Sequence, residues 1–262
     1  MYDFEFLRAT TLDEAVAALA DDDAQLLAGG QTLIPTMKAR LAAPSTLISL
    51  SGIPKLSGVH QKDKVLTIGA ATTHATVARD AAADFPALAA LASQIGDPAV
   101  RNRGTIGGSL ANNDPSGCYP AAALGSDATI ITTTRELSAG EFFDGLFATV
   151  LEDDEIIVAV RFPIPDAAEY AKMPQPASRF AMAGAFVARF GASVRVAITG
   201  AGEDGVFRWT EAEKALESDF SQEALKGMTV EAGGMIGDIH AAPDYRAHLV
   251  AVMTQRAVAA IS

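Results

Sequence analysis

The chain has 262 residues, 49% of them hydrophobic and 20% charged, which is typical of a globular protein of one large domain or two ordinary ones. The formal net charge of −12, without a lysine- or arginine-rich block, argues against sequence-independent nucleic-acid binding. No apolar run reaches the roughly 18 residues of a membrane span, no signal segment is seen, and the single cysteine, Cys118, excludes an intrachain disulfide or an all-cysteine cluster. We therefore expect a cytoplasmic protein without a membrane span.

The first 170 residues alternate between helical and strand patterns. A capping box at Thr11–Glu14 opens the first helix, and the following strand runs into Gly29-Gly30. Strand, glycine turn, helix and strand make a small βαβ unit with the glycines at its ligand-facing end. The expected helices are 11–20, 32–41, 73–80, 84–94 and 141–146, and the expected strands are 25–28, 46–50, 64–70, 128–133 and 156–162.

A proline-interrupted segment from Pro163 to Pro176 marks the expected domain boundary. Beyond it the pattern predicts strands at 180–190, 194–200 and 206–209, followed by helices at 210–216, 221–226 and 243–261. The last helix carries the clearest apolar stripe. We expect its buried face to consist of Tyr245, Leu249, Val252 and Met253, with Arg246 and Gln255 off that face.

The stretch from Ile95 to Ala123 is rich in glycine, small hydroxyl residues and amides, and it reads as a long loop with a helix-compatible end at 119–124. Its centre, Thr105–Ser109, contains a double glycine like that of Ala28–Thr32. Each turn is either a simple chain reversal or a nest of backbone N–H groups. Two converging nests would hold two adjacent phosphates without a lysine, although the overall charge of the chain opposes anion binding.

Other motifs give weaker indications. Gly200–Gly205 matches G-x-G-x-x-G, but its two acidic residues and the strand-like sequence after it favour a hairpin turn over a dinucleotide site. The four histidines are too scattered for a zinc site. Cys118 has no neighbouring base in the sequence, so a packed thiol is favoured over a nucleophile.

Three segments together carry a family resemblance: AGGQTLIPTMKARLAAPSTLISL, IGDPAVRNRGTIGGSLANNDPSGCYPAAAL and IGDIHAAPDYRAHLVAVMTQRAV. In order and spacing they resemble the FAD-binding medium subunit of molybdenum hydroxylases, the group of carbon monoxide dehydrogenase and xanthine-dehydrogenase-like flavin subunits. The resemblance implies an α+β chain. Residues 1–170 would form an FAD domain of two α/β subdomains, similar to vanillyl-alcohol-oxidase (PCMH-type) flavoproteins, and residues 176–262 a small domain with a three-stranded antiparallel sheet plus helices.

The resemblance also implies where FAD would bind. The two glycine turns would hold the pyrophosphate, apolar residues would line the cleft, and Lys172 would lie near the flavin. Relatives often have an aspartate where this chain has Cys118, so the hydrogen bond on the ribityl side would be weakened or supplied by Asp114. The expected FAD contacts are Leu27, Ala28, Gly29, Gly30, Gln31, Thr32, Leu33, Ile34, Ile95, Thr105, Ile106, Gly107, Gly108, Ser109, Asn112, Asp114, Cys118, Ile157 and Lys172.

The expected function is electron transfer by an oxidoreductase subunit with no catalytic side chain of its own. A molybdenum-cofactor-bearing large subunit and a [2Fe-2S] small subunit would be its partners, and electrons would leave the FAD for NAD, a quinone or oxygen. Two alternatives are a self-contained flavin-dependent oxidase or reductase and a cofactor-free scaffold subunit. No metal ligand set is expected within this chain.

Overall fold

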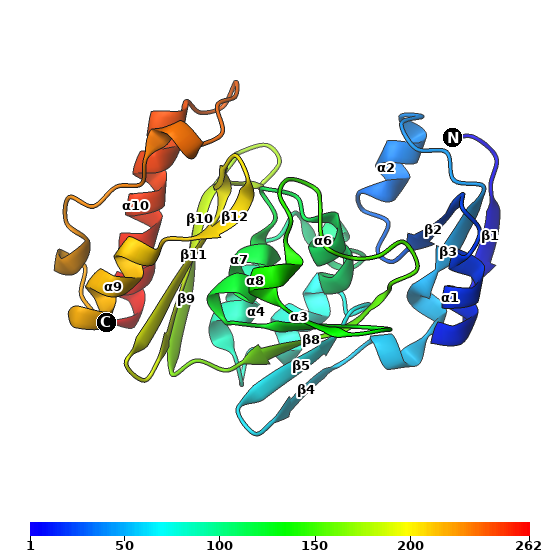
Figure 1. The fold of residues 1–262 in the computed structure, drawn as a ribbon, viewed down its shortest axis with the longest axis horizontal. Helices are drawn as coiled ribbons and strands as arrows, with labels where there is room; N and C mark the ends of the chain where they lie inside the picture. The colour runs from blue at the N-terminus through cyan, green and yellow to red at the C-terminus, as the bar shows by residue number, and fades with distance from the viewer.

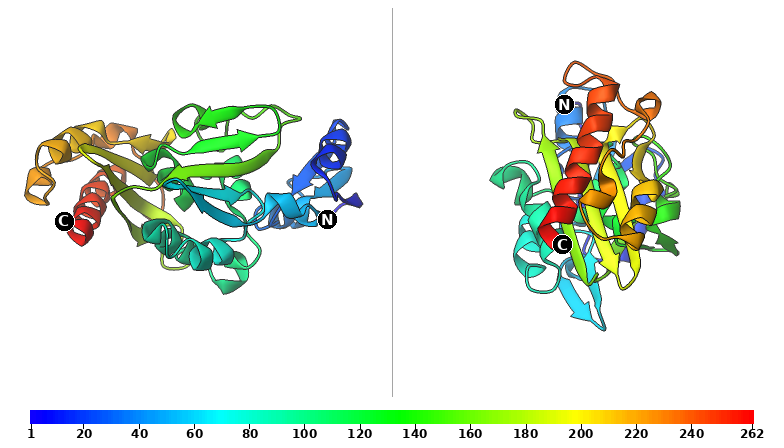
Figure 2. Two further views of the ribbon diagram at one scale, coloured as in Figure 1. Left: turned by 90° about the horizontal axis from the view of Figure 1, so that it is seen from below. Right: turned by 90° about the vertical axis from the view of Figure 1, so that its left-hand side faces the viewer.

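The structure is a computed structural model that describes residues 1 to 262. Three sheets lie in a row along an elongated molecule, with the N-terminus at one end and the C-terminus at the other (Figures 1 and 2). Their strand orders are β1-β3-β2, β4-β5-β8-β6-β7 and β12-β11-β10-β9. Helices cover each sheet, so the α+β class predicted from the sequence is confirmed. None of the helices combines the length and hydrophobicity needed to cross a bilayer.

The first sheet is small and parallel, and it contains the predicted βαβ unit. Its elements are β1 (Glu5–Arg8), α1 (Leu12–Leu19), β2 (Ala24–Leu27), α2 (Leu33–Lys38) and β3 (Thr46–Ser49), followed by 3-10 turns at Leu50–Gly52 and Pro54–Leu56. The side chain of Thr11 caps α1, whereas Glu14 reaches back to Thr10. The edge strand β1 was not predicted, because three of its four residues are exposed and it lacks an apolar alternation.

The second sheet is antiparallel and packs into the largest of the three core clusters, to which the third sheet also contributes. Its strands are β4 (Val59–Lys62), β5 (Val65–Gly69), β6 (Thr129–Thr132), β7 (Glu136–Ser138) and β8 (Ile157–Pro163). Between them come α3 (His74–Asp80), α4 (Pro86–Ser93), α5 (Pro98–Arg101), α6 (Ile106–Asn112), α7 (Cys118–Gly125) and α8 (Ala139–Phe142). The edge strands β4 and β7 were not predicted, and α8 begins before the expected helix at 141–146.

The prediction of a long loop is wrong for most of residues 95–123, because the stretch folds into α5 and α6, whereas the helix expected at 119–124 is present as α7. Short capping signals decide the outcome: Asp97 caps α5 by accepting from Val100 N–H at 2.8 Å, and Thr105 caps α6. Asn113 ends α6 in the left-handed region at φ 39°. Composition alone does not predict such short helices, because tertiary packing stabilises them more than intrinsic helix propensity does.

The third sheet holds the C-terminal part of the chain. It has four strands rather than the expected three: β9 (Ala167–Pro174), β10 (Ala181–Phe190), β11 (Ser193–Gly202) and β12 (Gly205–Arg208). Its helices are α9 (Thr210–Ser218) and α10 (Pro243–Ile261), with 3-10 turns at Glu223–Leu225 and Ala232–Gly234. The pairing of Gly202 with Gly205 makes the G-x-G-x-x-G segment a hairpin turn, as expected.

The additional strand β9 occupies the proline-interrupted segment at the expected domain boundary. It pairs with β10 along most of its length, because the prolines lie at its end and outside it. The predicted limits of 170 and 176 therefore fall inside and just after β9. We propose that the second domain begins at Ala167.

The predicted faces of α10 need one correction. Tyr245 is 44% exposed, whereas Arg246 is only 4% exposed. The Arg246 guanidinium donates to the carbonyl oxygens of Met182 and Gly200, each at 2.6 Å, and pairs with Asp238. A charged side chain is buried at this point because two carbonyls of the sheet accept from Nη1 and one carboxylate accepts from Nη2, whereas Nε has no partner.

Candidate functional site

A cavity of about 750 Å³ lies where the first and second sheets meet the hairpin between β9 and β10. Its walls include the loop after β2, the start of α6, the segment before β8 and the tip of that hairpin. The predicted site residues that line it are Leu27, Ala28, Gly29, Gly30, Gln31, Thr32, Leu33, Ile95, Thr105, Gly107, Gly108, Ser109, Asn112, Asp114, Cys118 and Ile157. The fold thus brings residues from distant segments to one cavity.

Three predicted residues lie outside that lining. Ile106 is fully buried in the core, and Ile34 lines a neighbouring cavity of about 310 Å³. Lys172 lies on β9, and the Cys118 side chain separates it from the cavity. Residues of the lining that the sequence did not suggest include His74, Gly104, Asp153, Glu155, Arg179 and Phe180.

The loop after β2 presents free backbone N–H groups to the cavity. From Ala28 to Leu33, six consecutive N–H groups have no acceptor in the chain. Gly30 has φ +69°, and a Cβ there would lie 3.0 Å from the Ile34 side chain, so this turn requires glycine. Consecutive free N–H groups form an anion-binding concavity. We call residues 28–33 the glycine loop.

The second double glycine has a different role from the one expected. The N–H groups of Ile106 and Gly107 donate to the carbonyl oxygens of Thr72 and Ala70, and that of Gly108 donates to the Thr105 hydroxyl. A Cβ on Gly107 would lie 2.6 Å from the Ala70 side chain. This glycine therefore seats α6 against the sheet. The expectation of a second nest of free N–H groups is corrected, because most of these donors already have partners.

The two glycine segments nevertheless meet. A Cβ on Gly29 would lie 2.7 Å from the Cα of Gly104 and would overlap the Arg103 carbonyl. A Cβ on Gly104 would in turn lie 2.5 Å from the Nε2 of His74. Gly29, Gly104 and the His74 ring are thus stacked with no side chain between the two backbones. This stack fixes the position of the glycine loop against α6.

His74 is a buried, uncharged part of this wall. It is 5% exposed and packs against the Tyr119 ring with centroids 5.3 Å apart. Burial lowers its pKa to about 4, and the positive charge of Arg101 acts in the same direction. Its Nδ1 has no hydrogen-bond partner in the chain. The ring is therefore neutral at pH 7.

Cys118 begins α7 at the cavity wall and is 5% exposed. The Nζ of Lys172 lies 3.6 Å from its Sγ and also donates to the carbonyl oxygens of Gln94, at 2.8 Å, and Arg179, at 3.0 Å. Burial raises the pKa of the nearby Tyr170 hydroxyl, and the Cys118 thiol acts in the same direction. Lys172 thus ties the hairpin of the third sheet to the end of α4.

Asp114, the candidate substitute for the missing aspartate, also lines the cavity. One carboxylate oxygen accepts from Ser116 N–H at 2.9 Å. Burial raises the pKa of this carboxyl group, and the hydrogen bond from Ser116 partly opposes that effect. Asp114 therefore retains acceptor atoms at the wall, two residues beyond Asn112.

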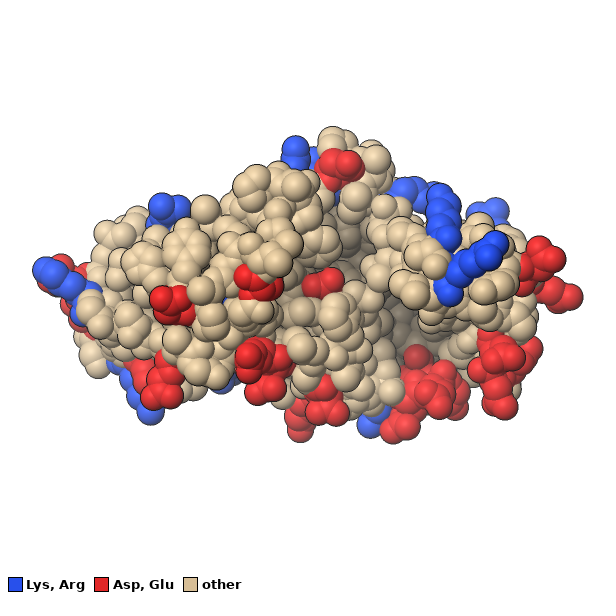
Figure 3. All heavy atoms as spheres, turned by 90° about the horizontal axis from the view of Figure 1, so that it is seen from above, with Lys and Arg blue, Asp and Glu red and all other residues tan.

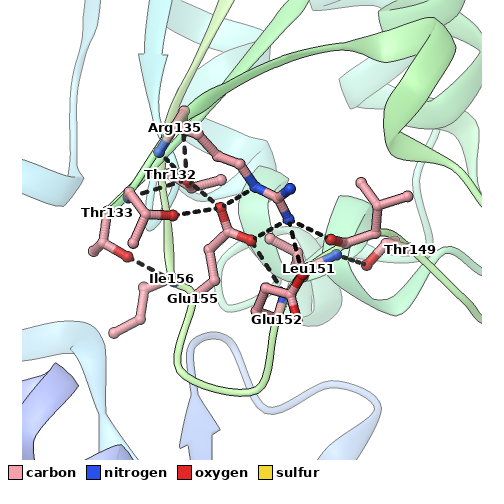
Figure 4. Close-up of polar contacts among 10 residues, drawn as sticks. Thr132, Thr133, Arg135, Thr149, Leu151, Glu152, Glu155 and Ile156 are labelled. Atoms are coloured by element: carbon pink, nitrogen blue, oxygen red, sulfur yellow. Dashed lines mark hydrogen bonds and ion pairs between the residues drawn. The ribbon is translucent and has the colours of Figure 1, made fainter.

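A polar cluster around Glu155 fixes the opposite wall (Figure 4). The buried carboxylate accepts from Thr132 at 2.5 Å, from Thr134 at 2.9 Å and from the Arg135 guanidinium at 2.8 and 2.9 Å. It also accepts from Glu152 N–H at 3.1 Å. The Arg135 guanidinium chiefly lowers the pKa of Glu155 to about 2. This ionised hub holds the turn after β6 to residues 150–157 of the cavity wall.

No spacing rule points to this hub, because Arg135 and Glu155 are 20 residues apart and are brought together by the pairing of β6 with β8. The structure brings together no group of three or more histidine, cysteine or carboxylate side chains able to hold a metal ion. The cavity therefore has a row of free backbone N–H groups at the glycine loop and many apolar residues in its lining. At one wall, Lys172 lies behind the Cys118 thiol.

Comparisons with known proteins give a consistent result. Residues 2–165 match the family model described as the FAD binding domain in molybdopterin dehydrogenase. The carbon monoxide dehydrogenase medium chain of Hydrogenophaga pseudoflava is 32% identical, covering 97% of this chain and 96% of its own length. The nicotine 6-hydroxylase medium subunit of Paenarthrobacter nicotinovorans is 33% identical, with coverages of 91% and 89%.

The fold comparison agrees with the sequence comparison. A solved structure of carbon monoxide dehydrogenase from Hydrogenophaga pseudoflava, lacking the Mo-pyranopterin moiety of its cofactor, superimposes with a TM-score of 0.89. The match covers 99% of this chain and 97% of the other, at 32% identity. The resemblance therefore extends through the C-terminal domain, beyond the residues of the family model.

Proposed function

Since the chain belongs to the family of FAD-binding domains in molybdopterin dehydrogenases, we propose that it accepts electrons from the iron–sulfur clusters of a partner subunit and passes them through FAD to an external acceptor. It is an FAD-binding oxidoreductase subunit of the molybdenum hydroxylase type. Bound flavin supplies the means of accepting electrons singly and releasing them in pairs. The acceptor we propose is NAD, a quinone or oxygen.

The observation that carries this proposal is the glycine loop at one end of the large cavity. Its six unpaired N–H groups suit the diphosphate of FAD, which needs donors close to the main chain. The cavity volume lies within the range of about 300–1,000 Å³ found for cofactor and ligand sites. Apolar residues such as Leu33 and Ile157 suit the rings of the cofactor. The residues present therefore fit FAD.

The chain's own residues would orient the cofactor and adjust its charge. Backbone N–H groups of the glycine loop would bind the diphosphate, and the ionised Glu155 hub would hold residues 150–157 in place. The ammonium group of Lys172 would stabilise negative charge on the reduced flavin, because an opposite charge at a partly buried site is only weakly screened. The structure offers no base that we assign to substrate chemistry.

The proposed partners are a molybdenum-cofactor-bearing large subunit and a [2Fe-2S] small subunit. The support is that relatives matched over nearly their whole length are named as medium chains or subunits. This chain also leaves large apolar side chains exposed on the loop after α8: Leu146 is 46% exposed and Phe147 is 60% exposed. Exposed apolar side chains on a loop that approaches the cavity wall suit a protein partner.

The proposal is tested by co-expressing the three subunits and analysing the purified assembly for FAD, molybdenum and iron. We expect the isolated chain to be yellow, with about one FAD per chain, and to be reduced only slowly by candidate substrates. The assembled complex should be reduced rapidly by its substrate. A folded chain that is colourless and shows no saturable FAD binding would contradict the proposal. Rapid reduction of the isolated chain would identify a self-contained flavin enzyme instead.

The substitution Cys118→Asp should leave FAD affinity unchanged or raise it by up to about tenfold. A carboxylate at this position would be paired with the Lys172 ammonium, which now lies 3.6 Å from the thiol, and would be a stronger acceptor for the cofactor. The FAD dissociation constant, measured by flavin fluorescence, checks this result. Cys118→Ser is the uncharged control. Weakening by Cys118→Asp of more than about tenfold would place position 118 away from the cofactor's hydroxyl groups.

A further inference from the structure

The only thiol of the chain lies beside a lysine side chain at the wall of the large cavity. The Sγ of Cys118 is 3.6 Å from the Nζ of Lys172, although the two residues are 54 positions apart in the sequence. They meet because β9 packs against α4, which in turn contacts α7. The sequence around Cys118 contains no base, so this pair of a thiol and an amine is a product of the tertiary fold.

The nitrogen of Lys172 is held by neutral partners alone. Its Nζ donates to the carbonyl oxygens of Gln94, at 2.8 Å, and Arg179, at 3.0 Å, and the sulfur of Cys118 is its third neighbour. No carboxylate is paired with it. Loss of the positive charge of Lys172 would therefore leave no buried anion without a partner, which is the costly outcome when one member of a buried ion pair is removed.

The Tyr170 hydroxyl is a polar group beside the same sulfur and has no partner. Tyr170 and Lys172 are two positions apart on β9, so their side chains lie on one face of the strand. Tyr170 is 2% exposed, and its hydroxyl has no hydrogen-bond partner in the chain. A Cβ on Gly184 would lie 2.5 Å from the hydroxyl oxygen, so the glycine gives this group its space. An oxygen atom added to the sulfur of Cys118 would offer the buried donor an acceptor.

The large cavity gives small molecules access to the sulfur of Cys118. A hollow separates the end of the molecule that carries the first sheet from the rest, and acidic side chains lie along part of its rim (Figure 3). The net charge of −12 opposes the entry of anions, but hydrogen peroxide is small and uncharged. Cys118 is 5% exposed, so bulky oxidants are excluded by size. Hydrogen peroxide is therefore an oxidant that both the charge and the burial admit.

We propose that Cys118 and Lys172 form a modification site, at which hydrogen peroxide oxidises the thiol and the sulfur then becomes bonded to the lysine nitrogen. In the first step the sulfur takes one oxygen atom from peroxide, the O–O bond breaks, and water leaves. The sulfur is oxidised by two electrons to a sulfenic acid, and the peroxide is reduced by the same two electrons.

The second step uses the adjacent amine. The ammonium group of Lys172 releases one proton to solvent, and its nitrogen attacks the sulfenic sulfur. An N–S bond forms, the S–O bond breaks, and a second water leaves, so the product is a sulfenamide. One thiol, one ammonium group and one peroxide thus give one sulfenamide, two waters and one proton. The four-carbon stem of lysine is flexible enough to close the gap between the two atoms.

The cross-link would change the molecule in two ways. It would join α7 covalently to β9 of the third sheet, and it would remove the positive charge of Lys172, which the proposed function places beside the reduced flavin. Thiol reductants would restore both side chains, because a sulfenamide is a reversible form of cysteine oxidation. The modification goes beyond the proposed function, since it requires the thiol, the amine and the cavity but not FAD.

The test treats the full chain with hydrogen peroxide and maps its peptides by mass spectrometry. We expect a linked pair of peptides that contain Cys118 and Lys172, two hydrogen atoms lighter than their sum, and we expect dithiothreitol to separate them. A parallel sample contains dimedone, which traps sulfenic acid. Lys172→Gln cannot form the cross-link, so it should carry about fivefold more trapped sulfenic acid than the unmodified chain.

Three variants serve as controls. Cys118→Ser should give no linked peptides. Lys172→Arg keeps the positive charge but lacks the amine nucleophile, so it should also give none and thereby separate the bond from the charge. Lys226→Gln removes an exposed lysine that pairs with Glu223, and the yield of cross-link should stay within about twofold. Thermal melting verifies that each variant is folded, and the peptide map of the unmodified chain is decisive by itself.

Two results would overturn this inference. One is a peroxide-treated chain in which Cys118 is reduced or is oxidised to sulfinic acid while Lys172 stays free. The other is equal trapping of sulfenic acid in the unmodified chain and in Lys172→Gln. Either result would leave the proposed function intact, because FAD binding is measured separately. A chain that forms the cross-link but binds no FAD would contradict only the proposed function.

Discussion

Gly29→Val should abolish retention of FAD, with affinity lowered by more than about 100-fold and a purified protein without yellow colour. A single added Cβ would overlap the Arg103 carbonyl and lie 2.7 Å from the Gly104 Cα. Both neighbours are backbone atoms, so they cannot yield as the end of a flexible side chain can. The glycine loop would have to move away from α6, and its N–H groups would no longer face the cavity.

Flavin content after purification, together with titration by fluorescence, measures this effect. Gly233→Val is the matched control, because no atom lies within 4 Å of a Cβ at that position and its backbone is not left-handed. A Gly29→Val protein that retained stoichiometric FAD would show that the glycine loop is not the diphosphate site.

Gly107→Val should also lose FAD, but by a different route. Its Cβ would press on Ala70, so the substitution acts on the packing of α6 against the sheet. Gly107→Val should therefore lower the melting temperature of the apoprotein more than Gly29→Val does, because the Gly29 site is less buried. Melting curves of the two apoproteins measure this difference.

Acidification from pH 6.5 to 4 should reduce the free energy of unfolding by about 3 kcal/mol through His74 alone. The pKa of this buried ring is about 4 in the folded chain, against an ordinary value of 6.5. Between these values the unfolded chain binds a proton that the folded chain does not, so stability falls as pH falls, and the loss is complete below pH 4. His74→Leu should flatten this part of the pH profile.

Urea unfolding at a series of pH values measures the slope. His248→Leu is the control, because His248 is exposed on α10. Glu155 acts in a lower window: its pKa is held at about 2, so the stability it contributes is present above pH 4.5 and is lost as pH falls toward 2. A slope between pH 6.5 and 4 that His74→Leu does not change would show that His74 is not kept neutral by burial.

Local sequence signals predict the parts of the fold that depend on local chemistry. The βαβ unit around Gly29-Gly30 and the turn at Gly202–Gly205 follow from periodicity and turn residues, and both are present. The edge strand β1 escapes prediction because it pairs with β3, far along the chain, whereas β9 pairs with the adjacent β10 and escapes prediction because prolines stand at its end and on both sides of it. The helix α6 escapes it because one capping threonine and tertiary packing outweigh two glycines.

The candidate site likewise contains some residues that the sequence predicts and others that it does not. The glycine pattern, supported by the family resemblance, indicates the residues that the fold gathers around the large cavity. The reason for each glycine is a matter of packing: Gly29 faces a backbone and Gly107 faces Ala70. The sequence does not predict the roles of Glu155, Arg135 and His74, because these roles depend on burial and on an ion pair between distant residues.

The contact of Lys172 with Gln94 joins segments that are 78 residues apart, so it forms only after the chain between them has been made. During synthesis the glycine loop emerges first, its supporting glycine at 104 emerges well after it, and the lysine that ties the third sheet to α4 comes last. Such distant contacts form slowly because the loop between them must close first. The lysine beside the large cavity therefore reaches its place only when β9 of the third sheet packs against the end of α4.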